Sequence, residues 1–344
     1  MGINFKDLVL KKEVSFDDLK GRVVVVDSFN VLYQFLATIR QMDGTLLMDS
    51  KGRVTSHLNG LFYRTTKMLQ YGLKPVFVFD GKSPDLKHRE KQRRQDLKDD
   101  AKRLYEVAKK EEDVDAMRKY AQRTSVLTRE MADEAKQLIS ALGLPFVQAP
   151  SEGEAQASFI VKRGDAFAVV SQDYDSLLSG APRLIQNLTV SERKKLPGKL
   201  SFAVVKPEMI DLSENLNVLG IDNDQLIAVA MLVGTDYNPG GVKGIGPKNA
   251  LKLVRQYGKD FDSLFKDMKF DDSCGVGWVD VYYTIKNIPV VDDYSLDFRP
   301  IDEDKVKALL VDGFDFSEDR VDSQLKKLVK QSRSKEQKGL GEFF

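Results

Sequence analysis

The chain has 344 residues, 42% hydrophobic and 31% charged, which is enough to bury a full core in one large or two modest domains. A formal net charge of +1 does not exclude nucleic acid as a partner, because the segregation of charge matters more than its sum. One cysteine excludes a disulfide framework, two histidines argue against a histidine metal site, and the longest apolar run, Leu226–Val233, is too short to span a membrane.

The N-terminal part alternates strand and helix patterns. Arg22–Asp27 (RVVVVD) and Lys74–Asp80 (KPVFVFD) are predicted to be buried strands, and each ends in an aspartate. Between them, Ser28–Gln41 and Leu58–Tyr71 have the apolar spacing of helices. This alternation indicates an α/β fold with a mainly parallel twisted central sheet flanked by helices. The carboxyl ends of parallel strands share one edge, so the terminal aspartates should converge there.

The segment Gly81–Arg123 is strongly charged and has few large apolar residues. Within it, Lys87–Arg94 (KHREKQRR) has five Lys or Arg side chains and one Glu. A helix that is polar on all sides either bridges solvent or meets a partner. A solvated helix pair fits the composition equally well, but insertion directly after Asp80 favours a functional role.

Two further acidic pairs have members two residues apart. They are Glu152 and Glu154 in APSEGEA, and Asp173 and Asp175 after the predicted strand Ala166–Val170. Like charges about 4 Å apart repel by about 4 kcal/mol at an effective dielectric near 20, so each pair needs a proton, a basic neighbour or a divalent cation. Helix capping is the alternative in both places, including a capping box formed by Ser151 and Glu154.

The second half contains a glycine-rich turn. Asp222–Val233 is predicted to be a helix that runs into Asp236. In Gly240–Ala250 (GGVKGIGPKNA) a tight turn leads into a helix that opens at Pro247. Its glycines would let the backbone approach an anion, although an ordinary connection between two helices is equally compatible.

The remaining elements are less distinct. We expect Pro182–Leu188 to be a strand that pairs with Leu200–Val205, and helices at Asp304–Val311 and Ser317–Val329. The chain then becomes polar and ends in two phenylalanines. Four residues near this end have helical spacing: Gln337, Leu340, Phe343 and Phe344. A helical turn would bring Leu340 and the two phenylalanines to one side, as a plug for a groove on a partner, unless they pack on their own domain.

Together these pieces resemble the flap endonucleases, the structure-specific 5′ nucleases of DNA replication and repair, and most closely their archaeal members. VDSFNVLYQFL, TSHLNGLFYRT, VFVFDGKSPDLK, APSEGEA, SQDYDSLL, GTDYNPGGVKGIGPKNAL, FSEDRV and QKGLGEFF occur in the family's order and spacing. The resemblance implies a PIN-like 5′-nuclease fold with a single nuclease domain at 1–330. That domain would include a charged helical arch at 81–125 and a helix–two-turn–helix DNA-binding element at 236–265. A flexible tail at 331–344 would carry a clamp-binding box.

The resemblance also implies roles for individual residues. Two Mg²⁺ ions, which Mn²⁺ can replace, would be held by seven acids: Asp27, Asp80, Glu152, Glu154, Asp173, Asp175 and Asp236. Lys87 and Arg94 would meet the scissile phosphate, and Tyr33 would stack on a base beside the cut. DNA contacts are expected at Arg40, Thr55, Arg64, Gly244, Gly246 and Lys248, with a K⁺ ion at the helix–two-turn–helix element. The sliding clamp PCNA would bind Gln337, Leu340, Phe343 and Phe344.

The implied function is a 5′ flap endonuclease with 5′-3′ exonuclease activity. It would cut branched DNA by two-metal hydrolysis in lagging-strand maturation and base excision repair, as a monomer in the cytoplasm with the nucleoid. Two other functions fit the residues alone: a magnesium-dependent phosphohydrolase of small phosphate esters, and a replication scaffold that binds branched DNA and uses its acids structurally. The first of these would need neither a basic arch nor a clamp box.

Overall fold

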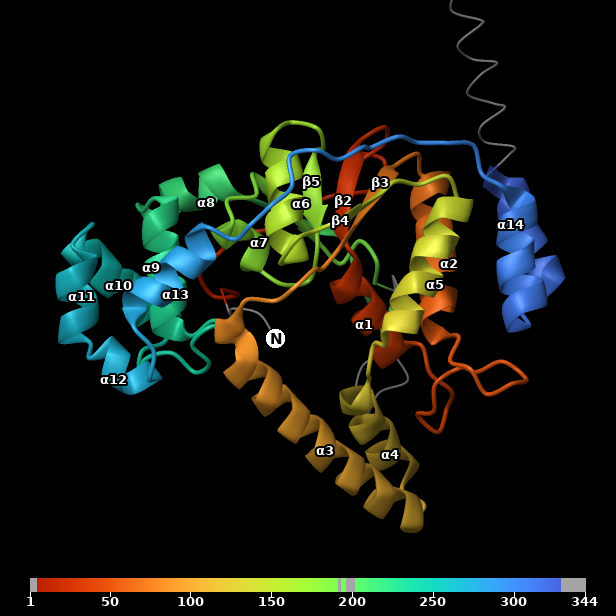
Figure 1. Cartoon of the computed structure of the whole chain (residues 1–344), viewed down its shortest axis with the longest axis horizontal. Coiled ribbons are helices and arrows are strands. Elements are labelled where there is room, and N and C mark those ends of the chain that lie inside the picture. The colour runs from red at the N-terminus through yellow and green to blue at the C-terminus, as the bar shows by residue number, and fades with distance from the viewer. Residues whose placement is uncertain (1–4, 191–192, 196–201, 329–344) are drawn as a thin grey trace, which may run out of the picture.

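The computed structural model describes residues 5–190, 193–195 and 202–328, and within them a seven-stranded sheet separates two helical layers (Figure 1). The strand order across the sheet is β1-β9-β6-β5-β2-β3-β4. The strand bounds are β1 Lys12–Glu13, β2 Val23–Asp27, β3 Lys74–Phe79, β4 Phe146–Gln148, β5 Ala168–Val170, β6 Arg183–Gln186 and β9 Glu208–Asp211.

Five strands, β6-β5-β2-β3-β4, are parallel, and β9 and β1 extend the β6 edge in antiparallel pairing. The chain builds β2, β3 and β4 toward one edge and then adds β5 on the other side of β2. In the register, Val26 of β2 lies beside Phe77 of β3 and Val170 of β5. The order therefore reverses between β2 and β5, which is where open parallel sheets bind ligands. The predicted mainly parallel sheet flanked by helices is confirmed.

Each face of the sheet has its own apolar core. Along β2, Val24 and Val26 join one core and Val25 joins the other, because successive side chains of a strand point to opposite faces. The Val24 face is covered by α1 Ser28–Thr38, α2 Ser56–Gln70, α5 Arg129–Ala141, α14 Glu303–Lys307 with the π-helical turn Ala308–Gly313, and a helix at 318–328. The helices of the Val25 side are α6 Gly153–Lys162, α7 Asp175–Leu178, α8 Leu212–Leu219, α9 Asn223–Val233, α10 Pro247–Tyr257, α11 Phe261–Asp267, α12 Phe270–Cys274 and α13 Trp278–Lys286.

Two charged helices, α3 His88–Lys110 and α4 Val114–Ala121, project from the body (Figure 1). Short 3₁₀ turns at Asp85–Lys87 and Gln122–Thr124 connect them to it. The pair packs together over small buried side chains, including Ala101, Ala108 and Ala121. Within the described residues, no single helix is both long and apolar enough for a membrane span; only the bent pair α8 and α9 meets that test, by length and composition alone.

The predicted pairing of Pro182–Leu188 with Leu200–Val205 is wrong. The edge of β6 is taken by β9, with Leu184 opposite Ile210, whereas β8 Phe202–Val204 pairs with β7 Arg193–Lys195 in a separate two-stranded sheet. Leu184 and Ile210 are both fully buried in the same core, so β9 supplies the apolar neighbour that a central strand needs.

Candidate active site

The structure brings all seven predicted acidic side chains to the lining of one cavity of about 740 Å³. They reach it from the carboxyl ends of three neighbouring strands, the first turns of two helices and the loop after α9. In that order they are Asp27 at the end of β2, Asp80 after β3, Asp173 after β5, Glu152 and Glu154 at α6, Asp175 at α7, and Asp236. The parallel sheet thus collects acids that lie far apart in the sequence, from Asp27 to Asp236.

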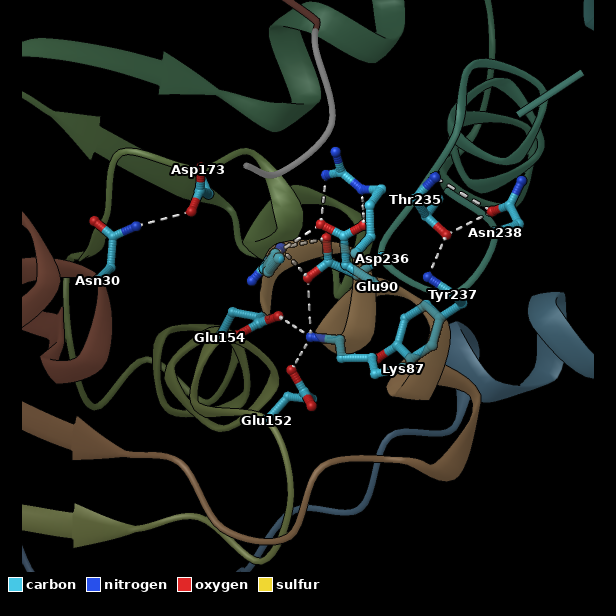
Figure 2. Close-up of polar contacts among 12 residues, drawn as sticks. Asn30, Lys87, Glu90, Glu152, Glu154, Asp173, Thr235, Asp236, Tyr237 and Asn238 are labelled. Atoms are coloured by element: carbon cyan, nitrogen blue, oxygen red, sulfur yellow. Dashed lines mark hydrogen bonds and ion pairs between the residues drawn. The ribbon is translucent and has the colours of Figure 1, made fainter. Parts of the chain in front are cut away.

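Asp27 and Asp173 are linked by Asn30, which the sequence analysis did not single out. Asp27 caps α1, since its Oδ1 accepts a hydrogen bond from the Asn30 backbone N–H at 3.0 Å. The Asn30 side-chain amide donates to Asp173 Oδ2 at 2.8 Å (Figure 2), and its carbonyl oxygen accepts from the Gln172 N–H at 3.1 Å. Its only sequence signal is a polar amide in the first turn of a largely apolar helix that follows an acid.

The capping alternative is wrong for both acidic pairs. Glu152 occupies the N-cap position of α6, and Tyr174 that of α7, without a side-chain cap bond. The hydroxyl of Ser151 instead donates to the Lys82 carbonyl at 3.1 Å. The Gly153 N–H at the start of α6 donates to Asp80 Oδ1 at 2.8 Å. The first N–H groups of a helix need acceptors from outside the helix. For α6 the acceptor is the Asp80 carboxylate, which follows β3, and not a side chain at the N-cap.

The glycine at the start of α6 makes room for the Asp80 carboxylate. A Cβ at Gly153 would stand 2.4 Å from Asp80 Oδ1, so a side chain there would displace the Asp80 carboxylate. The same absence of a side chain lets the Gly153 N–H reach the Asp80 carboxylate. The glycine of APSEGEA therefore fixes the spacing between two of the acidic groups.

The ammonium of Lys87 lies among the acids (Figure 2). Its Nζ donates to Glu152 and lies 3.4 Å from Asp236 Oδ2 and 3.7 Å from Glu154 Oε1. Burial by itself lowers the pKa of Lys87, but the charges of these carboxylates and the neighbouring Tyr237 outweigh burial and hold the pKa above its usual range. A positive charge is therefore strongly favoured at this point of the cavity.

Arg94 is the second cation in the cavity. Its Nη2 donates to both oxygens of Asp236, at 2.7 and 2.9 Å. The loop that carries Asp236 is itself fixed, because Asn238 Oδ1 accepts from the Thr235 hydroxyl at 2.6 Å and the Thr235 N–H at 3.2 Å (Figure 2). Both cations come from the start of the projecting helices, so this charged segment is tied to the sheet edge through the acids.

Burial and mutual repulsion keep several of the acids above their usual pKa. Burial, followed by the charge of Asp80, raises the pKa of Asp27 to about 8. Burial, followed by the charge of Glu152, raises the pKa of Asp80 to about 6. The pKa of Glu154 is also raised, by burial in the first place, although Lys87 opposes the shift. The cluster therefore needs protons or cations to exist at neutral pH.

The donor set fits a hard divalent cation, which prefers carboxylate oxygens. In the arrangement described, no three His, Cys, Asp or Glu side chains among the described residues converge closely enough to hold one ion. The reason lies in the ion pairs above, because Glu152, Glu154 and Asp236 are turned toward the Lys87 and Arg94 cations. The seven acids are thus gathered in one cavity, and Glu152, Glu154 and Asp236 have cationic side chains as partners.

The other predicted site residues are distributed more widely. Tyr33 lines the same cavity, and the Lys98 ammonium lies 5.5 Å from the centre of its ring. Arg40 lies outside the lining, and its guanidinium donates to the Leu36 and Gly44 carbonyls and the Ser125 hydroxyl, each at 2.8 Å. It therefore joins α1 to the base of the projecting helices.

The predicted DNA contacts at the helix starts lie apart from the cavity lining. Thr55 is buried at the N-cap of α2, and Arg64 lies within that helix. Gly244 has a φ of 85°, a conformation that favours glycine, and Gly246 is the N-cap of α10. Lys248 is exposed in the first turn of α10. The predicted clamp box, Gln337, Leu340, Phe343 and Phe344, lies outside the described residues.

The chain is similar in sequence to known families and proteins. The XPG N-terminal domain family matches residues 2–101 and the XPG I-region family matches 143–236. Flap endonuclease 1 of Staphylothermus marinus is 49% identical over 351 aligned positions, covering 100% of both chains. Flap endonuclease 1 of Hyperthermus butylicus is also 49% identical, over 97% of this chain and 95% of its own.

Solved structures show the same fold. Flap endonuclease-1 from Methanococcus jannaschii superposes with a TM-score of 0.76 at 42% identity, over 97% of this chain and 100% of that one. The catalytic core of Rad2 in complex with a DNA substrate has a TM-score of 0.69 at 23% identity, over 95% of this chain and 100% of that one, which speaks for the fold alone.

Proposed function

This chain belongs to the flap endonucleases, and on that premise we propose that its seven clustered carboxylates hold two Mg²⁺ ions that serve the hydrolysis of branched DNA. Nuclease activity on flap DNA and a general dependence on divalent metal follow from membership of the family. The identity of the metal, the number of ions and the roles of individual residues are the proposal. The observation that carries it is the convergence of all seven acids on one cavity that also holds Lys87 and Arg94.

The acids supply the ligands of the proposed ions, directly or through water: Asp27, Asp80, Glu152, Glu154, Asp173, Asp175 and Asp236. Bound Mg²⁺ or Mn²⁺ lowers the pKa of a water and stabilises negative charge on the phosphate. The chain contributes the rigid placement of the oxygens. Asn30 fixes the carboxylate of Asp173, and the Gly153 N–H fixes that of Asp80.

Lys87 and Arg94 are proposed to bind the scissile phosphate. In the structure both are paired with carboxylates, so each must exchange an acidic partner for phosphate oxygens when DNA enters. Charge that builds on the phosphate in the transition state is stabilised by fixed cations of this kind. Tyr33, on the wall of the same cavity, is proposed to stack on the base beside the cut once that base has left the duplex.

The rest of the DNA is proposed to be held through its phosphates and so without sequence preference. The turn around Gly244 and the start of α10 would contact the duplex through backbone N–H groups and Lys248, with a K⁺ ion at that turn. Thr55, Arg64 and Arg40 would contribute near the 3′ flap and the arch base. Cleavage is proposed to leave a 5′-phosphate, with 5′-3′ exonuclease activity beside flap cleavage.

We also propose that the protein is a monomer that works in the cytoplasm with the nucleoid and binds PCNA through its C-terminal residues. The support for the clamp contact is the sequence QKGLGEFF alone. The two other functions considered from the sequence, phosphohydrolase and scaffold, lose their basis with membership of the family.

The proposal is tested by incubating labelled flap, nicked and single-stranded DNA with and without Mg²⁺. We expect cleavage of the flap substrate in Mg²⁺ or Mn²⁺ and none in EDTA. Asp175→Ala should bind flap DNA but not cleave it, whereas Asp133→Ala, an exposed acid on α5, should behave as wild type. Normal turnover of Asp175→Ala in Mg²⁺ would contradict the proposed metal role.

A further inference from the structure

Glu90 is a buried acid in a helix whose other charged side chains are largely exposed. It lies in the first turn of α3 and is 3% exposed. A carboxylate is stable in such a position only with cationic or hydrogen-bonding partners. The functional roles described above do not use Glu90, so its burial calls for a separate explanation.

The partners of Glu90 are two arginines of its own helix. Arg93 donates from Nε to Glu90 Oε2 at 2.7 Å and from Nη2 to Oε1 at 2.8 Å. Arg94 donates from Nε to Glu90 Oε1 at 2.7 Å. The spacings of three and four residues place all three side chains on one helix face. Burial by itself raises the pKa of Glu90, but the two guanidinium groups outweigh it and leave the pKa lowered.

Arg94 is consequently held from two sides. Glu90 accepts from its Nε, and Asp236 accepts from its Nη2. A guanidinium is planar, so two acids that bind different edges fix both its position and its plane. The contact with Asp236 joins two separate elements, whereas the contact with Glu90 lies within α3.

We propose that Glu90 is a positioning residue that keeps the Arg94 guanidinium directed into the cavity when Asp236 changes partner. The inference rests on the proposed role of Arg94 at the scissile phosphate. When DNA enters, Arg94 must release Asp236, and Glu90 is then the acid that moves with the same helix. Without it, Arg94 would have more rotamers available and would be aligned with the phosphate for less of the time.

The test is a double-mutant cycle under single-turnover conditions in Mg²⁺, with saturating flap DNA. Glu90→Ala should slow the single-turnover rate by roughly tenfold, with the Kd for flap DNA changed by less than about threefold. In an Arg94→Ala background the same change should have less than about a twofold effect, because two residues that act through one contact are not additive. Glu90→Gln, which keeps an acceptor oxygen for Arg94 Nε, should lie between Glu90→Ala and wild type.

Two controls separate this role from a structural one. Glu106→Ala removes an exposed acid of the same helix and should leave the rate unchanged. Arg93→Ala removes the other partner of Glu90 and should slow the rate less than Glu90→Ala does. Equal slowing by Glu90→Ala in the wild-type and Arg94→Ala backgrounds would overturn the inference. A normal rate for Arg94→Ala alone would instead overturn the proposed role of Arg94.

Discussion

Asp27→Asn should stabilise the metal-free protein at neutral pH even though it removes a proposed metal ligand. Asn caps helices about as well as Asp, so the bond from the Asn30 N–H to the side chain at position 27 is retained. The substitution removes the ionisation of a carboxyl whose pKa is raised to about 8, chiefly by burial. The variant therefore measures how much the burial of the Asp27 carboxyl lowers the free energy of unfolding.

The sign and size follow from proton linkage. The carboxyl of an unfolded Asp has a pKa of 3.8, whereas the folded Asp27 keeps its proton up to about pH 8. Between these values the folded state binds more protons, so the free energy of unfolding falls as the pH rises, by about 1.4 kcal/mol per pH unit for a full proton. From pH 5 to pH 7 the free energy of unfolding of the wild type is expected to fall by about 2 to 3 kcal/mol through Asp27. Asp27→Asn should abolish this contribution to the pH dependence.

The assay is urea unfolding in EDTA at pH 5, 6 and 7 for wild type and Asp27→Asn. A matched control is Asp222→Asn, which caps α9 and whose pKa is lowered by Lys259 and the Gln225 N–H against the effect of burial. That control should follow the wild-type pH dependence. Parallel curves for wild type and Asp27→Asn would refute the reasoning, since they would mean that Asp27 titrates alike in the folded and unfolded chains.

Two further predictions concern the cations and the C-terminal tail. Lys87→Ala should slow the single-turnover rate by about tenfold or more, because a cation is lost beside the phosphate. An unchanged rate would mean that Lys87 does not act on the phosphate and serves only in its ion pairs with the acids. Phe343→Ala combined with Phe344→Ala should abolish stimulation by the clamp and spare clamp-free cleavage. Equal loss of both activities would point to packing of these residues on the domain itself.

The sheet and its acidic edge were predictable because their signals are local. Runs such as RVVVVD combine an apolar strand with a terminal acid, and parallel topology then dictates that the acids meet. The pairing of β6 was not predictable, because both Leu200–Val205 and β9 have the pattern of a strand. The choice depends on tertiary packing, in which Ile210 of β9 shares a core with Leu184 of β6. The helices α11 to α13 lie in a part of the sequence without clear periodicity.

Within the site, the residues proposed to contact metal or DNA were predictable from the sequence, whereas the residues that position them were not. Asn30 and Glu90 act through other residues, and neither has a spacing that marks it without the fold. Glu90 had a weak signal, an acid three and four residues before two arginines, but the same spacing is typical of solvated helices. The capping alternative at Glu152 could be rejected only once Asp80 was seen to bind the first N–H of α6.

The acidic cavity is proposed to bind two metal ions. The most direct test is an anomalous difference map at the manganese edge from crystals soaked in Mn²⁺. We predict two peaks within the ring of carboxylates, with the Lys87 ammonium displaced from Glu152. A map without peaks there, or with peaks only on surface acids, would show that the cavity does not bind the two ions.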